Sequence, residues 1–469
     1  MCLLIFITTF VHHLLRSIKD ALVLYEPGSG AEVISFLKTY MILPASIAAA
    51  IFYMRLRKYY DMPRSYYAIV AGYCVFYTFF AFIVFPNVDY LHPDIQLVAQ
   101  LKQQYPVFRW FIAIWGMWSY ALYYVAAELW GTYVLSVLFW QLANDTVHLD
   151  EAERFYPLFV TLSNTALFAL NPFIKSVAVF PDNGVFVSNM VIVASSIIMM
   201  AIFRYMEEYD PDTSVRLRTQ TEPAVPKKKT VLTEDGWLTA GRSEYIWYIA
   251  LLVFCYAAII TLVETTWKAQ VKSFYVSKAE QMVFYADYTL YTGLATILMN
   301  TLSKSVIKKF GWTVGAIITP ISCGVLGSLF YALLLAQQQV WLPDLLQANI
   351  VQIAVWTGAI SVMFSRGAKY SFFDPTKEMA FIPLDKKLST NGKAVADGMA
   401  AKLGKSFGGW FISSATMLVG FDLEGLCATL AVLVLALSVF WLFAVLRLGV
   451  LYRKQVQLSA TQAQDTVMV

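Results

Sequence analysis

The sequence predicts an all-α polytopic membrane protein with about 12 transmembrane helices in two six-helix halves. Three observations support this fold class. Hydrophobic residues make up 59% of the chain and charged residues only 14%, against about 25% charged in an ordinary soluble domain. Apolar runs long enough to cross a bilayer recur along the chain. Basic loops also recur at similar places in its two halves.

Apolar runs of roughly 18 to 25 residues define the predicted spans. In the first half they lie at 2–24, 32–54, 66–86, 108–136, 155–180 and 184–205. In the second half they lie at 245–265, 281–302, 312–336, 346–369, 398–420 and 423–449. The chain between the halves is polar and contains three prolines, as flexible connectors often do. We therefore predict an N-terminal half at 1–205, a cytoplasmic linker at 206–243, a C-terminal half at 244–452 and a cytoplasmic tail at 453–469.

The distribution of Lys and Arg orients these spans, because cytoplasmic loops carry an excess of both residues. Basic residues gather at 55–64, in the linker, and at 303–310, 370–395 and 452–454, all on one side of the predicted topology. The opposite loops are poor in basic residues apart from Lys272 and Lys278. We therefore expect both termini and the linker to be cytoplasmic. The N-terminus lacks the pattern of a cleaved signal peptide.

The two halves are predicted to be related repeats. The basic loop after the second span starts near 55, and the loop after the eighth starts near 303. The same offset carries Lys19 to the charged cluster between Glu264 and Lys268. Two six-helix repeats with cytoplasmic termini are the architecture of transporters whose substrate sites lie near the middle of the bilayer.

Ionisable residues at membrane depth are the strongest functional signal, since each costs about 2.5–3.5 kcal/mol on insertion scales. They are Arg16, Lys19, Asp20, Glu128, Glu264, Lys268, Arg366, Lys369, Lys402 and Lys405, so cations predominate. Lys and Arg side chains near helix ends commonly extend to the interface, which is a sufficient explanation for Arg366, Lys369 and Lys402. It does not suit Lys19, nor does it suit Glu128, which has apolar residues on both sides for several turns. Several lysines around one cavity favour a polyanion, with phosphate as the first candidate.

Other chemistries find little support in the sequence. The adjacent His12 and His13 would face different sides of a helix, so they do not form a metal pair. The segment GMAAKLGKS at 398–406 has the wrong glycine spacing for a phosphate loop and follows no strand. We find no nucleophile or metal constellation, and expect no enzyme activity and no cofactor. The net charge of +4 is too small for this length to imply nucleic acid.

Several long blocks resemble the ATP/ADP translocase family of plastids and intracellular bacteria. They are IKDALV followed by PGSGAEVI, AELWGTYVLSVLFWQLAN, RFYPLF, ETTWK and SRGAKYSFFDPTKEMAFIPLD, and the resemblance extends from about residue 15 to 450. It implies a major-facilitator-like fold and nucleotide exchange across a membrane. It also implies four charged positions important for transport: Lys19, Glu128, Glu264 and Lys377.

We therefore expect two groups of site residues. The substrate-binding group is Lys19, Lys268, Lys377, Arg16 and Arg366, and the transport or gating group is Glu128, Glu264, Asp20 and Glu378. Glu128 should make no phosphate contact, because both groups are anionic, and should bond to a basic residue of the opposite half when the cavity is empty. Two cations are expected to stay uncompensated without substrate, which adds a barrier of about 5–7 kcal/mol to crossing of the empty carrier.

The preferred function is ATP/ADP antiport by alternating access in the inner membrane of an intracellular bacterium. The alternatives are proton-coupled nucleotide symport, with Glu128 or Glu264 as proton carrier, and exchange of other nucleotides or NAD. The expected partners are ATP, ADP and the lipid bilayer, with no obligate protein partner.

Overall fold

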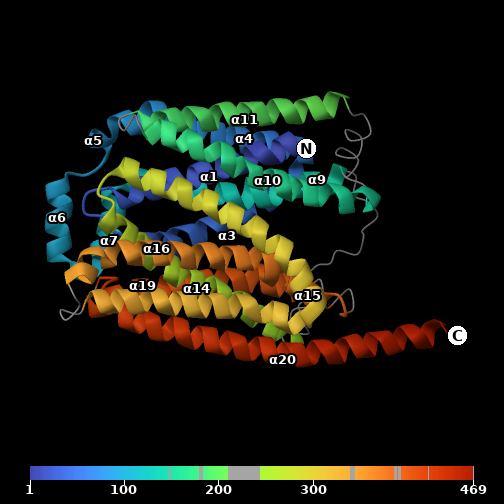
Figure 1. The fold of residues 1–469 in the computed structure, drawn as a ribbon. Helices are drawn as coiled ribbons and strands as arrows, with labels where there is room; N and C mark the ends of the chain where they lie inside the picture. The colour runs from blue at the N-terminus through green and yellow to red at the C-terminus, as the bar shows by residue number, and fades with distance from the viewer. Residues whose placement is uncertain are drawn as a thin grey trace. The chain divides into compact units, whose positions relative to one another are not determined.

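A computed structural model of the chain describes residues 1–146, 149–178, 183–209, 243–338, 344–384, 388, 392–420 and 422–467. Within these ranges the regular structure is helical, and they contain no β-strand (Figure 1). The predicted all-α fold class is therefore confirmed. The chain divides into two compact units, one of Met1–Lys227 with Tyr275–Leu290 and one of Lys228–Phe274 with Tyr291–Val469.

Unit 1 is built around the first helix. α1 (Cys2–Leu24) packs against α8 (Trp118–Trp130), α10 (Leu149–Ala178) and α11 (Gly184–Tyr209). Most of its side chains are buried, including Lys19 and Asp20. The other long helices are α3 (Leu43–Tyr59) and α4 (Met62–Phe79). Shorter elements connect or extend them: α2 (Ala31–Phe36), η1 (Leu37–Ile42), η2 (Phe80–Val84), η3 (Phe85–Asn87), α5 (Val88–Leu91), α6 (Ile95–Gln104), η4 (Pro106–Phe108), α7 (Arg109–Gly116), η5 (Gly131–Phe139) and α9 (Trp140–Thr146).

Unit 2 is built around α14 (Glu244–Phe274), the most buried of its candidate spans. This helix packs against α16 (Asp344–Ala368), α19 (Ala401–Val419) and α20 (Cys427–Val467), and against the π-helix η7 (Ala394–Ala400). The π-helix η6 (Lys369–Phe373) joins α16 to α17 (Asp374–Phe381). A helix that is apolar on all sides belongs in the centre of a bundle, and α14 occupies that place.

The long helix α15 (Lys278–Gln337) is two helices joined by a sharp turn at Gly311. A straight helix of 60 residues would extend about 90 Å, three times the hydrocarbon thickness of a bilayer. Gly311 has φ 84°, a conformation that favours glycine because it lacks a Cβ. The chain accordingly turns back on itself there, as the yellow ribbon in Figure 1 shows.

Nine helices of the described residues are long and apolar enough to cross a membrane. One of them is the doubled helix α15, which covers the predicted spans at 281–302 and 312–336. The predicted spans at 155–180 and 398–420 correspond to α10 and α19, which are long but contain more polar residues. Each of the twelve predicted spans therefore has a helical counterpart.

The ends of several elements differ from the predicted ones. α11 continues to Tyr209, so the first residues of the predicted linker are helical, and residues 210–242 lie outside the described ranges. α20 continues without a break from the last span into the predicted tail. Tyr275–Leu290, which the sequence assigns to the C-terminal half, belongs to unit 1. A helix boundary depends on tertiary contacts as well as on hydropathy, and hydropathy alone does not contain those contacts.

Candidate functional site

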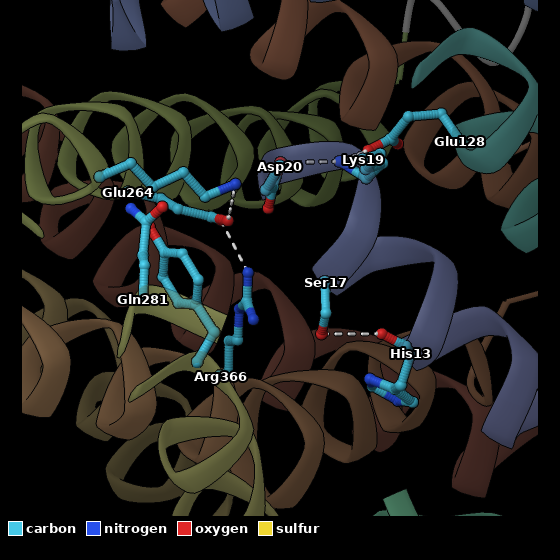
Figure 2. Close-up of polar contacts among 10 residues, drawn as sticks. His13, Ser17, Lys19, Asp20, Glu128, Glu264, Gln281 and Arg366 are labelled. Atoms are coloured by element: carbon cyan, nitrogen blue, oxygen red, sulfur yellow. Dashed lines mark hydrogen bonds and ion pairs between the residues drawn. The ribbon is translucent and has the colours of Figure 1, made fainter. Parts of the chain in front are cut away.

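Lys19 lies at the centre of a buried charged cluster in unit 1. Its ammonium nitrogen is 3.1 Å from Asp20 Oδ1 and 2.8 Å from Glu128 Oε1. It also lies 3.7 Å from the centre of the Tyr124 ring, where the electron-rich face attracts a cation. Tyr124 and Glu128 are one turn apart on α8 and therefore share the helix face that packs against α1. Figure 2 shows Lys19 between Asp20 and Glu128.

The three charged side chains of this cluster differ in exposure. The Lys19 side chain is 4% exposed and Asp20 is 5% exposed, but Glu128 is 36% exposed. A buried ammonium needs a permanent anionic partner, because an unpaired charge in a low-dielectric interior is very costly. Glu128 is therefore the less buried of the two carboxylates that pair with Lys19.

Glu264 holds the corresponding cluster in unit 2. Its carboxylate lies 2.7 Å from the Arg366 guanidinium on α16 and 3.3 Å from the Lys268 ammonium, one turn further along α14 (Figure 2). The three side chains are between 4% and 14% exposed. The cluster therefore brings two cationic side chains to one place, and cations of this kind form the charge-assisted hydrogen bonds that bind phosphate.

The packing of α14 against α16 places Arg366 within reach of Glu264. The Trp267 indole N–H donates to the Val355 carbonyl oxygen at 2.9 Å. The same indole lies directly on Gly358, where an added Cβ would stand 2.4 Å from Trp267 Cδ1. Glycine at this position therefore allows the two helices to approach closely.

Each cluster joins the first long helix of its unit to a later helix. In unit 1 the lysine is on the first long helix and the carboxylate is on α8. In unit 2 the carboxylate is on the first long helix and the arginine is on α16. In both units a π-helix begins three residues after the partner, at Gly131 and at Lys369. π-Helical turns inside α-helices occur frequently at functional sites, so this shared feature supports the assignment of both clusters as one repeated site.

Lys377 forms a third cluster, also in unit 2. Its ammonium lies 2.5 Å from Asp397 on η7 and 3.4 Å from Glu378, and Glu378 pairs with Lys393 at 2.6 Å. The sequence analysis did not identify Asp397, Lys393 or Tyr124. The position of Tyr124 one turn before Glu128 was a signal that could have found it. The contact between Asp397 and Lys377 joins distant segments, and no sequence spacing indicates it.

Glu128 pairs with Lys19 of its own half, and its expected contact with a basic residue of the opposite half stays a prediction. One expectation about charge differs from the structure. Lys19, Lys268, Arg366 and Lys377 each lie close to a carboxylate, so the two uncompensated cations that we expected are not found among them. The reason is that helix packing supplies acidic partners that are distant in sequence. Arg16 lies one turn before Lys19 on α1 and is half-buried.

The clusters have the composition of an anion-binding site. Within the described ranges, no three His, Cys, Asp or Glu side chains gather as a metal ion would require. The cations are held on packed helices, with partners that keep their charge in place. Such a site can bind phosphate through several charge-assisted hydrogen bonds without forming a covalent bond.

Comparisons with known proteins agree with clusters that have the composition of an anion-binding site. The family model described as TLC ATP/ADP transporter matches residues 1–452. ADP,ATP carrier protein 1 of Rickettsia prowazekii (strain Madrid E) is 34% identical over 446 residues, which cover 92% of this chain and 88% of the relative. ADP,ATP carrier protein 3 of Rickettsia conorii (strain ATCC VR-613 / Malish 7) is 30% identical over 469 residues, which cover 96% of this chain and 93% of the relative.

Two solved structures have the same fold at low sequence identity. A bacterial homologue of the iron transporter ferroportin, in an inward-facing state, matches with a TM-score of 0.56 at 13% identity, over 95% of this chain and 98% of that one. A mutant of the nucleoside transporter NupG matches with a TM-score of 0.54 at 11% identity, over 95% of this chain and 99% of that one. Both are transporters, and the likeness confirms the major-facilitator-like fold class.

Proposed function

Because the chain belongs to the TLC ATP/ADP transporter family, we propose that it exchanges ATP for ADP across a membrane by alternating access. The protein is a multi-pass membrane transporter of nucleotides and not an enzyme. The observation that carries the finer proposal is the pair of charged clusters around Lys19 and Glu264, whose cations are buried. Cations at membrane depth that are held on rigid helices suit the di- and triphosphate groups of the two substrates.

In this proposal, phosphate oxygens take the place of Glu128 beside Lys19. The buried ammonium keeps Asp20 as a permanent partner, and its second partner is the more exposed carboxylate. A phosphate arriving from solvent therefore displaces Glu128 and needs no rearrangement of α1. Lys268, Arg366, Lys377 and Arg16 are the other proposed phosphate-binding residues. Glu264, Asp20 and Glu378 hold these cations in place.

Proton-coupled nucleotide symport is the second candidate, and the exposure of Glu128 favours it. A carboxylate beside a buried lysine, with access to solvent, can gain and lose a proton as its partner changes. The same clusters also fit other nucleotides and NAD, because all of them contain phosphate.

The proposed location is the inner membrane of an intracellular bacterium, with both termini in the cytoplasm. The orientation is supported by the basic residues at the ends of α3, which include Arg57 and Lys58, and by Arg453 and Lys454 near the end of the chain. The named relatives come from Rickettsia species, which supports the location.

The test uses the purified full-length protein in lipid vesicles that contain labelled ADP. External ATP should release the label rapidly, whereas adenosine, which lacks phosphate, should not. A protonophore should leave the rate unchanged. Release without any external nucleotide would overturn exchange, and loss of transport with the protonophore would support symport instead.

A further inference from the structure

The segment Tyr275–Leu290 belongs to unit 1, although it follows the first helix of the predicted C-terminal half. It contains the turn after α14 and the first part of α15. None of its residues is part of the three charged clusters described above. Its contacts within unit 1 therefore require a separate explanation.

Tyr25 makes the first set of these contacts. It directly follows α1, and its hydroxyl donates hydrogen bonds to the carbonyl oxygens of Tyr275 at 2.8 Å and Ser277 at 3.1 Å. The acceptors are backbone atoms, so the contact depends on the position of the turn and not on the identity of its side chains.

Asp287 makes the second set. Its carboxylate accepts a hydrogen bond from the Asn171 amide at 2.8 Å and pairs with the Lys175 ammonium at 2.6 Å. Asn171 and Lys175 are one turn apart on α10, so both face the same part of α15. Asp287 is 28% exposed and Lys175 is 44% exposed, so the pair lies where water can reach it.

Both sets of contacts lie near one side of the membrane. Tyr25 follows the first span, Lys175 lies in the last turn of the fifth, and Tyr275 follows the seventh. Odd-numbered spans of a chain that crosses the membrane each time end on the same side. With cytoplasmic termini, that side is the outer one.

We propose an outer lock that holds Tyr275–Leu290 against the end of α1 and against α10, and so closes the outer entrance. The lock is formed by Tyr25, Asn171, Lys175 and Asp287. The proposal rests on the alternating access proposed above, in which the entrance must open once in each cycle. To open outward, the first part of α15 has to leave α1 and α10, so these contacts have to break. They are few and partly hydrated, so they can break and reform during each cycle.

The test measures opening directly, with a cysteine placed behind the lock. Gln281 is fully buried and lies between Ser277 and Asp287 in the sequence. Because it is buried, Gln281→Cys should react slowly with a membrane-impermeant maleimide added outside intact cells. The five natural cysteines are replaced in this background. Asp287→Asn removes the ionic part of the contact but keeps an acceptor for Asn171, and should raise the labelling rate about three- to tenfold. Tyr25→Phe removes a single hydroxyl and should raise it as well.

Two comparisons separate the lock from general damage to the fold. The charge-exchanged double variant Lys175→Asp with Asp287→Lys should return labelling close to the starting rate. Glu208→Gln removes an exposed ion pair with Arg204 on α11 and should leave labelling unchanged. Equal labelling rates in all variants would overturn the lock. So would a double variant that labels faster than Lys175→Asp alone or Asp287→Lys alone.

The labelling readout is also independent of the nucleotide proposal. Faster labelling in Asp287→Asn together with absent ATP/ADP exchange would uphold the lock and refute the proposed substrates. Normal ATP/ADP exchange with an unchanged labelling rate would uphold the proposed substrates and refute the lock.

Discussion

Lys19 is a cation whose surroundings are strongly anionic and aromatic. Asp20, Glu128 and the Tyr124 ring enclose an ammonium that is almost inaccessible to water. Removing one partner of a buried pair typically costs about 3–5 kcal/mol, so this arrangement needs a compensating function or a strong structural reason. The proposed phosphate binding would provide such a function, because a phosphate would take the place of the more exposed of the two carboxylates.

Replacing Lys19 by glutamine should weaken ATP binding about ten- to hundredfold, which is the range of one or two charge-assisted hydrogen bonds. Isothermal titration of the purified protein measures this change. Lys308→Gln, at an exposed position on α15, is the matched control and should bind as the unchanged protein does. Unaltered affinity in Lys19→Gln would refute its role as a phosphate ligand.

Glu128→Gln should have a different effect, because Glu128 competes with phosphate for Lys19. Removing this competitor should leave the affinity for ATP equal or higher. Exchange should become slower, because Glu128 is no longer there to displace the bound nucleotide from Lys19. Binding and exchange rates measured on the same preparation test this split. Weaker binding with a normal exchange rate would show that the assigned role is wrong.

At the scale of helices, each unit joins its first long helix to a later one through a buried ion pair. The pair between Lys19 and Glu128 joins α1 to α8, and the pair between Glu264 and Arg366 joins α14 to α16. Both first helices carry a lysine and a carboxylate, Lys19 with Asp20 on α1 and Lys268 with Glu264 on α14. Sequence reasoning placed all four residues in the predicted site, but it could not pair them, because it could not show which helices pack together.

The contact between Glu264 and Arg366 can be measured with a double-mutant cycle. Arg366→Gln and Glu264→Gln should each lower the thermal stability of the detergent-solubilised protein, by about 1–3 kcal/mol in free energy of unfolding. The double variant should be more stable than the sum of the two effects predicts, with an interaction energy of about 0.5–3 kcal/mol. Strict additivity would mean that the pair contributes nothing to joining α14 and α16.

The approach of α14 to α16 depends on a small residue, which gives a second test at this scale. Gly358→Ala adds a Cβ that would overlap Trp267, so it should destabilise the protein by about 1–3 kcal/mol. Gly72→Ala makes the same change in α4, where nothing lies within 4 Å of the added atom, and should be neutral or slightly stabilising. Equal melting temperatures for both variants would contradict this account of the interface.

For the whole molecule, composition and hydropathy were enough to predict the all-α membrane class and a helix at each of the twelve predicted spans. These features are local, since each depends on a run of neighbouring residues. The assignment of Tyr275–Leu290 to unit 1, the contact of Asp397 with Lys377 and the turn at Gly311 depend on distant contacts or on backbone conformation. Hydropathy contains no information about them, and they required the structure.

The paired lysines also change the explanation of exchange. Lys19, Lys268, Arg366 and Lys377 each lie close to a carboxylate, so these four give the proposed empty carrier a smaller electrostatic barrier to crossing than unpaired cations would. Exchange therefore depends more on the contacts that hold the empty carrier closed, and the proposed outer lock is one set of such contacts.

The most direct test of the central claim is the entry of labelled ATP into vesicles that contain either ADP or no nucleotide. Both sets of vesicles hold the same amount of full-length protein, and a protonophore is present throughout. The account predicts rapid entry into vesicles with internal ADP and very slow entry into empty ones. Equally rapid entry into both would contradict it, because a carrier that returns freely without substrate does not exchange.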